Sequence, residues 1–302
     1  MNFQVRVAIF AFATAATLHA EDFHRILKTG NAPHISVSTG AGYVHVMSSD
    51  ANEVQVTGHV RKSTNNWGWG AGNAEERIRQ IVSNPPIEQN GDSINIGRGH
   101  DRELQRNIVI DYDVLVPRNA TVEGRSGSGD VRAANLGGAF SGSSGSGDME
   151  AVNVHSFVRL DTGSGSIHVH DLYGNSLLKT GSGDIEIQQS APGDVQAETG
   201  SGSIRIRNVN GAVRAATGSG DVEAQGKAMG DWKVVTGSGS IRLELMPNSG
   251  FRVDASTGSG SIRLPQVTGT GAELNKHHVV MSVHGGGPAL KLQTGSGDIE
   301  VR

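Results

Sequence analysis

The chain has 302 residues and a net charge of −4, from 26 basic and 30 acidic side chains, so a strongly basic face is not expected and nucleic acid is a poor candidate partner. Its 43 glycines and an aromatic content of 4% are typical of a protein with many tight turns around a thin core. The sequence contains no cysteine, which excludes disulfides, thiolate metal sites and lipid attachment through cysteine.

Residues 1–20 have the features of a secretory signal peptide. Arg6 supplies the basic start, Val7 to Leu18 form the apolar stretch, and Ala20 is the small residue before a cut. Because the apolar stretch is too short to span a bilayer comfortably, we expect cleavage rather than a retained anchor, which is the alternative. No later stretch is apolar enough to cross a membrane. The sequence therefore predicts an exported protein, in the periplasm, in the cell envelope or outside the cell.

Residues 21–120 lack a clean repeat, and we interpret them as an N-terminal β cap that includes degenerate repeats. His34 to Val46 reads as one such repeat, and strands are expected near 54–56, 94–96 and 109–116. A short helix is predicted over 74–82, with Asn73 as its N-cap and Pro85-Pro86 as its stop.

The densest aromatic feature is the segment 66–70, Asn-Trp-Gly-Trp-Gly. The side chains of Trp67 and Trp69 in a glycine-rich loop could stack on a sugar ring or lie at a membrane interface. The alternative is that the loop packs both indoles against the N-terminal cap.

Residues 121–302 are dominated by a short repeat. The motif Thr/Ser-Gly-Ser-Gly-Asp/Ser-Ile/Val/Met occurs nine times, with steps of 18, 18, 18, 19, 18, 19, 21 and 37 residues; its first residues are Ser126, Ser144, Thr162, Thr180, Thr199, Thr217, Thr236, Thr257 and Thr294. A short fixed period indicates stacked, nearly identical units. The last step is about two periods, which predicts a degenerate copy near residues 268–284.

Each unit contains two short alternating segments separated by two turns. In the unit that starts at Thr180, Ile185 and Ile187 alternate with polar residues after the Gly-Ser-Gly turn, and Val195 and Ala197 alternate after a second turn. We therefore predict an all-β fold, a parallel β-solenoid (β-helix) of about 18-residue, two-strand rungs. The motif threonines fall on the inward parity, so their hydroxyls are expected to bond along the stack.

The outward position after the first apolar residue of each rung supports parallel stacking. It reads Arg, Glu, His, Glu, Arg, Glu, Arg, Arg, Glu, at positions 132, 150, 168, 186, 205, 223, 242, 263 and 300. Equivalent residues in stacked parallel strands lie about 4.8 Å apart, where opposite charges attract and like charges repel. A meander would place the other strand type between them and remove the reason for alternation.

Two other coils with a similar period fit less well. A left-handed hexapeptide helix needs three apolar clusters per coil, whereas these rungs have two. A calcium β-roll carries Gly-Gly-x-Gly-x-Asp twice per coil, whereas this chain has one Gly-Ser-Gly-Asp per rung and replaces the Asp by Ser in alternate rungs.

Two histidines are candidate metal ligands. His168 and His170 lie on one face of a predicted strand, with Glu150 and Glu186 expected on the neighbouring rungs, and imidazoles with carboxylates can hold a divalent metal. The alternative is that His168 only fills its place in the charged column. The chain stops at a repeat strand, residues 299–302, which predicts an uncapped edge and a possible end-to-end homo-oligomer through the C-terminal rung.

The segment 110–117, Ile-Asp-Tyr-Asp-Val-Leu-Val-Pro, followed by Ser128-Gly129-Asp130-Val131 and by the ending from Gly285-Gly286-Gly287-Pro288 to Ile299, resembles an exported bacterial family of unknown function labelled putative adhesins. The similarity covers roughly residues 33–302. The resemblance implies a β-solenoid and an envelope location, and it implies no catalytic residues.

We accordingly predict an exported, non-enzymatic adhesin or envelope interaction module without a cofactor, whose partner is a protein or a glycan. The alternative is a carbohydrate-binding or polysaccharide-cleaving β-helix centred on Trp67 and Trp69. The turns between strands are only a few residues long, which leaves little room for an enclosed substrate cleft.

Overall fold

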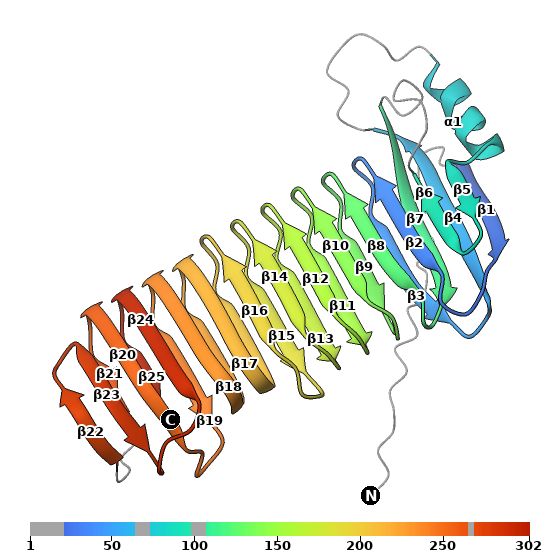
Figure 1. The fold of residues 1–302 in the computed structure, drawn as a ribbon. Coiled ribbons are helices and arrows are strands. Elements are labelled where there is room, and N and C mark those ends of the chain that lie inside the picture. Colours follow the sequence, from blue (N-terminus) through green and yellow to red (C-terminus); the bar gives the residue numbers. More distant parts are fainter. Residues whose placement is uncertain (1–20, 64–72, 98–106, 265–268) are drawn as a thin grey trace, which may run out of the picture.

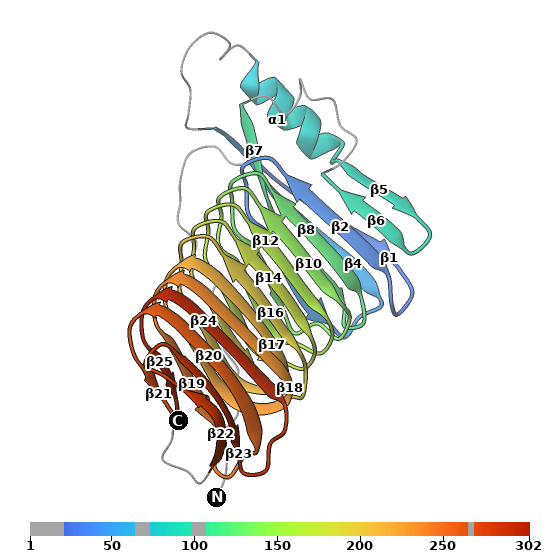
Figure 2. The same cartoon turned by 60° about the vertical axis from the view of Figure 1, so that its left-hand side comes forward.

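The computed structural model of the chain describes residues 21–63, 73–97, 107–264 and 269–302. It is a straight stack of strands with a capping structure at each end (Figure 1). The strands form one continuous, open hydrogen-bonded sheet that folds back at every rung into two facing layers (Figure 2). The predicted signal peptide and the segment with Trp67 and Trp69 lie outside the described residues.

The first layer contains the strands that follow the Gly-Ser-Gly turns. Its order in space is β1 (Glu21–Lys28), β4 (Glu53–Lys62), β7 (Ile108–Pro117), β3 (Val44–Ser49), β9 (Val131–Ala134), β11 (Met149–Val154), β13 (Ile167–Leu172), β15 (Ile185–Gln189), the first parts of β17 (Ile204–Ser219) and β18 (Val222–Ser238), β19 (Ile241–Leu245), β25 (Ile299–Val301) and β21 (Ile262–Arg263).

The second layer faces the first. Its order is β5 (Ile87–Asn90), β6 (Ser93–Ile96), β2 (His34–Thr39), β8 (Thr121–Ser126), β10 (Phe140–Ser144), β12 (Val158–Thr162), β14 (Ser176–Thr180), β16 (Val195–Thr199), the later parts of β17 and β18, β24 (Ala289–Ser296), β20 (Phe251–Ser259), β23 (His278–Val283) and β22 (Gly269–Leu274). Neighbours are parallel throughout the repeats and antiparallel in the two caps.

The core lies between the layers because the repeat strands alternate buried and outward residues. Ile185, Ile187, Val195 and Ala197 are all buried, as the alternating pattern predicted, while the residues between them point outward. The parallel β-solenoid is therefore confirmed. At the decisive pair, Glu186 on β15 lies in register with Arg205 on the parallel strand β17.

The Thr-Gly-Ser-Gly turns join the layers at one corner, which we call the glycine–serine corner. The Thr180 hydroxyl, which is buried, donates to the carbonyl oxygen of Gly165 on the preceding rung at 2.8 Å and accepts from the Gly183 N–H at 3.1 Å. The predicted column of threonines thus exists, and its hydroxyls bond to backbone groups along the stack.

Glycine is needed at this corner because neighbouring rungs approach closely. A Cβ on Gly183 would lie 2.0 Å from the carbonyl oxygen of Gly165, whereas the Gly183 backbone does not adopt a positive φ. The Asp/Ser position next to it is also structural. Asp184 Oδ1, for example, accepts the N–H of Ser203 on the next rung at 2.8 Å.

The N-terminal cap is formed by antiparallel strands and helix α1 (Ala74–Ser83), whose Ile78 and Ile81 are buried where the helix packs beside β1 and β4. The helix begins where the sequence predicted. Asn73 is its N-cap residue, as predicted, but Asn73 adopts a left-handed conformation and its side chain makes no capping hydrogen bond.

The C-terminal end differs from the prediction in two ways. Residues 269–283 do not form a degenerate rung; β22 and β23 make an antiparallel hairpin against β20. The chain then returns, and β24 inserts between β18 and β20 while β25 inserts between β19 and β21. The repeat strand at 299–301 therefore has partners on both sides, and the free edge on which the end-to-end homo-oligomer was predicted is not there.

Candidate functional site

The candidate metal ligands lie on β13 in the first layer. His168 is in register with Glu150 on one side and Glu186 on the other, as predicted, and His170 is in register with Val152. Both histidines are half-buried. Across the described ranges, no group of three or more His, Asp or Glu side chains is placed to hold a metal ion. A metal at this pair stays a prediction.

A row of charged side chains runs along the outer face of the first layer, and we call it the outer column. In spatial order it contains Asp113, His45, Arg132, Glu150, His168, Glu186, Arg205, Glu223, Arg242, Glu300 and Arg263. Ion pairs within it include Arg132–Glu150 at 3.5 Å, Arg205–Glu223 at 3.7 Å and Arg242–Glu223 at 3.3 Å.

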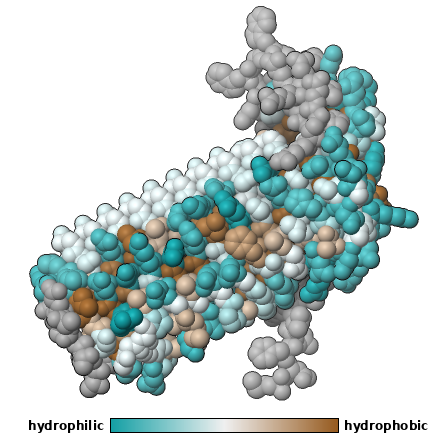
Figure 3. Space-filling model, in the orientation of Figure 1, coloured by the Kyte–Doolittle hydropathy of each residue, from teal (hydrophilic) through white to brown (hydrophobic). Residues whose placement is uncertain are grey.

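The surface view shows how these features are distributed. Figure 3 shows a pale, uniform ridge along one long side, formed by the exposed Gly-Ser pairs of the glycine–serine corner, with hydrophilic and apolar patches on the face below it. The stack is thus regular and smooth at one corner and chemically varied on its face.

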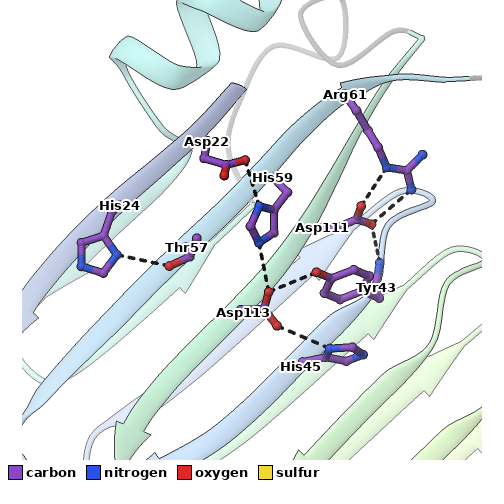
Figure 4. A network of polar contacts seen from close by, with 9 residues as sticks. All are labelled: Asp22, His24, Tyr43, His45, Thr57, His59, Arg61, Asp111 and Asp113. Carbon is purple, nitrogen blue, oxygen red and sulfur yellow. Dashed lines mark hydrogen bonds and ion pairs between the residues drawn. The ribbon is translucent and has the colours of Figure 1, made fainter. Parts of the chain in front are cut away.

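The sequence interpretation missed a polar network at the N-terminal end of the outer column. It lies on the outer face of four adjacent strands, β1, β4, β7 and β3 (Figure 4). Asp113 on β7 is its centre: the His59 Nε2 atom lies 3.1 Å from Asp113 Oδ2, the Tyr43 hydroxyl donates to the same oxygen at 3.0 Å, and His45 Nδ1 lies 3.4 Å from Oδ1.

The network continues to β1, the strand at the N-terminal edge of the first layer. The other ring nitrogen of His59 lies 2.8 Å from Asp22 Oδ1 on β1. His59 therefore lies between two carboxylates. Its hydrogen bond with Asp113 raises the pKa of His59 to about 9, against the opposing effect of burial and with further support from Asp22.

The pKa values of Asp113 and Tyr43 shift in opposite directions. Burial acts to raise the pKa of the Asp113 carboxyl, but the hydrogen bonds from His45, His59 and Tyr43 outweigh it and hold that pKa below its usual range. Burial, with the adjacent Asp113, raises the pKa of Tyr43. The Tyr43 ring also stacks on His45, with ring centres 4.1 Å apart.

A second carboxylate lies two residues away on β7. Asp111 is buried, accepts from Arg61 Nε at 2.8 Å and Nη2 at 3.3 Å, and accepts the backbone N–H of Tyr43 at 3.0 Å. The two carboxylates thus fasten the cap strands to the first repeat rung, and at neutral pH they hold one protonated imidazole and one guanidinium. This chemistry suits a structural clasp rather than proton transfer to a substrate.

The sequence pattern indicates which side chains of this network point outward, but it does not indicate which of them pair. Asp111 and Asp113 alternate with apolar residues, and so do His59 and Arg61, which marks both pairs as outward on their strands. Their pairing depends on the antiparallel register of β4 and β7, which local sequence does not specify.

The family of the chain follows from its similarity to known sequences. The sequence model of the Toastrack DUF4097 family matches residues 112–302, which is more than half of the chain. The chain belongs to the Toastrack DUF4097 family. The matched region begins within β7 and includes every rung that carries the Gly-Ser-Gly motif, while most of the polar network precedes it. None of the curated proteins matches the chain.

Three solved structures resemble this Toastrack chain over nearly its full length. A protein from Clostridium sporogenes ATCC 15579 described as a putative cell adhesion protein is 12% identical, with 94% of this chain and 99% of that chain covered and a TM-score of 0.30. A putative adhesin from Bacteroides fragilis NCTC 9343 is 14% identical, with coverage of 93% and 97% and a TM-score of 0.40. A putative lipid binding protein from Parabacteroides distasonis ATCC 8503 is 12% identical, with coverage of 93% and 96% and a TM-score of 0.44. At these identities and TM-scores, the likeness says nothing about what the present chain binds.

Within the described residues, the structure contains no helix with the length and apolarity that a bilayer-spanning segment requires.

Proposed function

We propose that the chain is an exported, non-enzymatic interaction module of the adhesin kind that acts at the bacterial cell envelope. The outer column carries the proposal. From Arg132 to Arg263 it presents basic side chains (Arg or His) in alternation with glutamates, on a long, open face that a large partner can approach.

Physical properties of the scaffold support a binding role over an enzymatic one. Parallel strands paired on both sides hold each outward side chain at a fixed height on the stack, so the surface is pre-organised for a partner. Short turns leave the face open, whereas substrates of enzymes are usually enclosed. The features of residues 1–20 support export, and the resemblance of three solved structures described in terms of adhesion or lipid binding is consistent with a surface location.

The test uses the chain from Glu21 onward, immobilised and exposed to isolated envelope fractions of a bacterium. Retention of envelope material is expected, and because charge complementarity contributes, retention should fall with ionic strength. Glu223→Arg, which replaces an acid between Arg205 and Arg242, should weaken retention, whereas Ser182→Ala at the glycine–serine corner should not. No retention at any salt concentration, together with rapid glycan turnover by the purified protein, would reject the proposal.

Two further predictions concern the candidate residues. Saccharide binding at Trp67 and Trp69 is tested on a glycan array with the wild type and the double Trp→Ala variant. Metal-assisted assembly through His168 and His170 is tested by elemental analysis of tag-free protein, and an empty protein would reject it.

A further inference from the structure

A groove crosses the second corner of the stack, where first-layer strands turn into second-layer strands. Its volume is about 550 Å³, within the range of roughly 300–1,000 Å³ that ligand sites commonly show. Four successive rungs line it, through the segments 189–192, 208–210, 225–227 and 244–247. We call it the corner groove.

The repeat length changes at this corner. From Ile167 to Ser176 the chain takes nine residues, but from Ile185 to Val195 it takes ten, although both pairs occupy equivalent positions in register. Val222 to Trp232 is also ten residues long. The spacing across the glycine–serine corner stays constant in these rungs. In solenoids, insertions collected on one side often mark the binding side.

Two buried acceptor atoms of the corner groove have no protein partner. Gln189 is 1% exposed, and its Nε2 donates to the Gly174 carbonyl oxygen at 3.1 Å, which fixes Oε1 as an acceptor. Within the described part of the chain, neither Gln189 Oε1 nor Asn210 Oδ1 receives a hydrogen bond. Both oxygens have almost no accessible surface, so a ligand donor reaches them only when the surrounding side chains shift. Because a buried acceptor without a donor is costly, a ligand that offers hydroxyl or amide donors after such a shift gains affinity.

The rest of the lining indicates a neutral, polar ligand. Asn208 and Gln225 add two more carboxamides, each both a donor and an acceptor, and Ser190 adds a hydroxyl. Among the described lining residues, Lys227 and Glu244 are the charged pair, so the groove has no net charge to select a phosphate or a carboxylate.

The usual modes of peptide recognition do not fit this groove. Strand addition needs a free backbone edge, but here the backbone is already paired between rungs, as in Met246 N–H to Gly226 O at 3.1 Å and Gly193 N–H to Asn210 O at 3.2 Å. Helix docking needs a mainly apolar groove, proline-rich ligands need aromatic walls, and phosphopeptides need arginines, none of which the described lining provides. Recognition by side-chain amides and hydroxyls remains, and this suits the hydroxyl groups of a sugar.

An aromatic platform continues the same corner toward the N-terminal end. Leu172 is in register with Gln189, so Tyr173 follows it in the place that Ser190 takes on the next rung. The Tyr173 ring is 40% exposed and stacks on His155, with ring centres 4.1 Å apart and an interplanar angle of 7°. Phe157 nearby along the chain is 43% exposed. Such rings offer an apolar face to a sugar and, for tyrosine, a polar tip.

We infer that the corner groove binds a neutral oligosaccharide, which donates hydroxyls to Gln189 Oε1 and Asn210 Oδ1 and extends along the corner toward Tyr173. This site is separate from the segment with Trp67 and Trp69. The inference rests on the proposed interaction function and deepens it by naming the class of ligand.

The test is calorimetric titration of the chain from Glu21 onward with soluble neutral oligomers of glucose and of N-acetylglucosamine, two to six sugars long. Binding to at least one series is expected to strengthen with oligomer length, because a longer chain reaches from the groove to Tyr173. Asn210→Ala and Tyr173→Ala should each weaken that binding at least tenfold while the thermal unfolding midpoint stays close to that of the wild type.

Ser182→Ala at the opposite corner and the double substitution of Trp67 and Trp69 by Ala are the matched controls, and both should leave the titration unchanged. Absence of binding to every oligomer overturns the inference, and so does binding that is lost only when the two tryptophans are replaced. If oligosaccharides fail while envelope fractions are still retained by the outer column, the corner-groove inference fails and the proposed function stands. If both fail, the proposed function fails as well.

Discussion

Arg242 lies in register with Glu300, not with Arg263, which carries the same charge and comes first along the chain. The inserted strand β25 thus places an acid between two bases. In chain order Arg242 and Arg263 follow one another without an acid between them, but in spatial order the charges of the outer column alternate to its end. The Asp/Ser position of the motif also alternates in spatial order, because Asp298 lies between Ser240 and Ser261. Its Oδ1 accepts the Ser261 N–H at 2.8 Å.

The inserted strands should hold the C-terminal cap onto the stack. Leu292 on β24 is 1% exposed and in register with Val234 on one side and Ala255 on the other. Leu292→Ala is expected to destabilise this end by about 2–5 kcal/mol, because it leaves a cavity in the core. Hydrogen exchange should accelerate in β20 and β23 together. The exposed neighbour Lys291→Ala is the control, and unchanged exchange in β20 after Leu292→Ala would contradict the topology.

Reversing one charge should destabilise the outer column in a salt-dependent way. Glu223→Arg places three like charges on consecutive strands, between Arg205 and Arg242, and should lower the free energy of unfolding by a few tenths to about 1 kcal/mol. Chemical denaturation at low and high ionic strength measures it, because salt screens exposed charges. Glu223→Gln removes the attraction without adding repulsion and should cost less. Equal losses for the two variants would show that the column has no electrostatic role.

The threonine at the glycine–serine corner should matter for its hydroxyl rather than for its size. Thr180→Val keeps the shape of the side chain but removes the donation to Gly165 O and leaves the Gly183 N–H without an acceptor, which should cost about 1–3 kcal/mol. Thr180→Ser retains the hydroxyl and should recover most of the stability in denaturant titration. If serine is as destabilising as valine, packing of the methyl group is the dominant contribution.

Because of the polar network, the free energy of unfolding should fall as the pH becomes alkaline. The pKa of His59 is about 9 in the folded chain and about 6.5 in an unfolded one, so its contribution is complete below pH 6.5 and is lost as pH rises through 9. Because the ring is partly exposed, the loss should be roughly 1–2 kcal/mol after solvent screening. Thermal unfolding from pH 6 to 9.5 should show this decline in the wild type and a flatter profile in His59→Gln.

The control for the pH profile is His24→Gln, because the imidazole of His24 contacts the neutral hydroxyl of Thr57 at 3.2 Å rather than a carboxylate. Its profile should follow that of the wild type. A wild-type profile that is flat between pH 6.5 and 9 would show that His59 does not hold its proton between Asp22 and Asp113.

The repeats could be predicted from sequence because each rung repeats the same local pattern. Spacing alone placed Glu186 opposite Arg205 and put the motif threonines inside. The caps could not be predicted in this way, because their pairings join segments far apart in the chain, such as Asp113 with His59. The segment 269–283 lacks the period, so the sequence predicts a degenerate copy where the structure has a hairpin.

The insertion of β25, by contrast, left a trace that was available from sequence. The order Arg242, Arg263, Glu300 breaks an otherwise regular alternation, and moving Glu300 between the arginines restores it. Position in a charged column thus reports spatial order even where chain order misleads. The corner groove could not be foreseen, because its orphaned oxygens depend on how the Gln189 and Asn210 side chains pack against adjacent rungs.

The inserted strands also constrain the order of events during synthesis. A chain that emerges from its N-terminus completes β20 and β21 before residues 289–301 exist, and until then β18 and β20 each have a strand edge with unpaired amides and carbonyls. A polypeptide that lacks residues 289–301 therefore exposes two strand edges with unpaired backbone groups, which can pair with other chains. Loss of residues 289–301 is consequently expected to cause aggregation or proteolysis rather than to leave a slightly shorter rod.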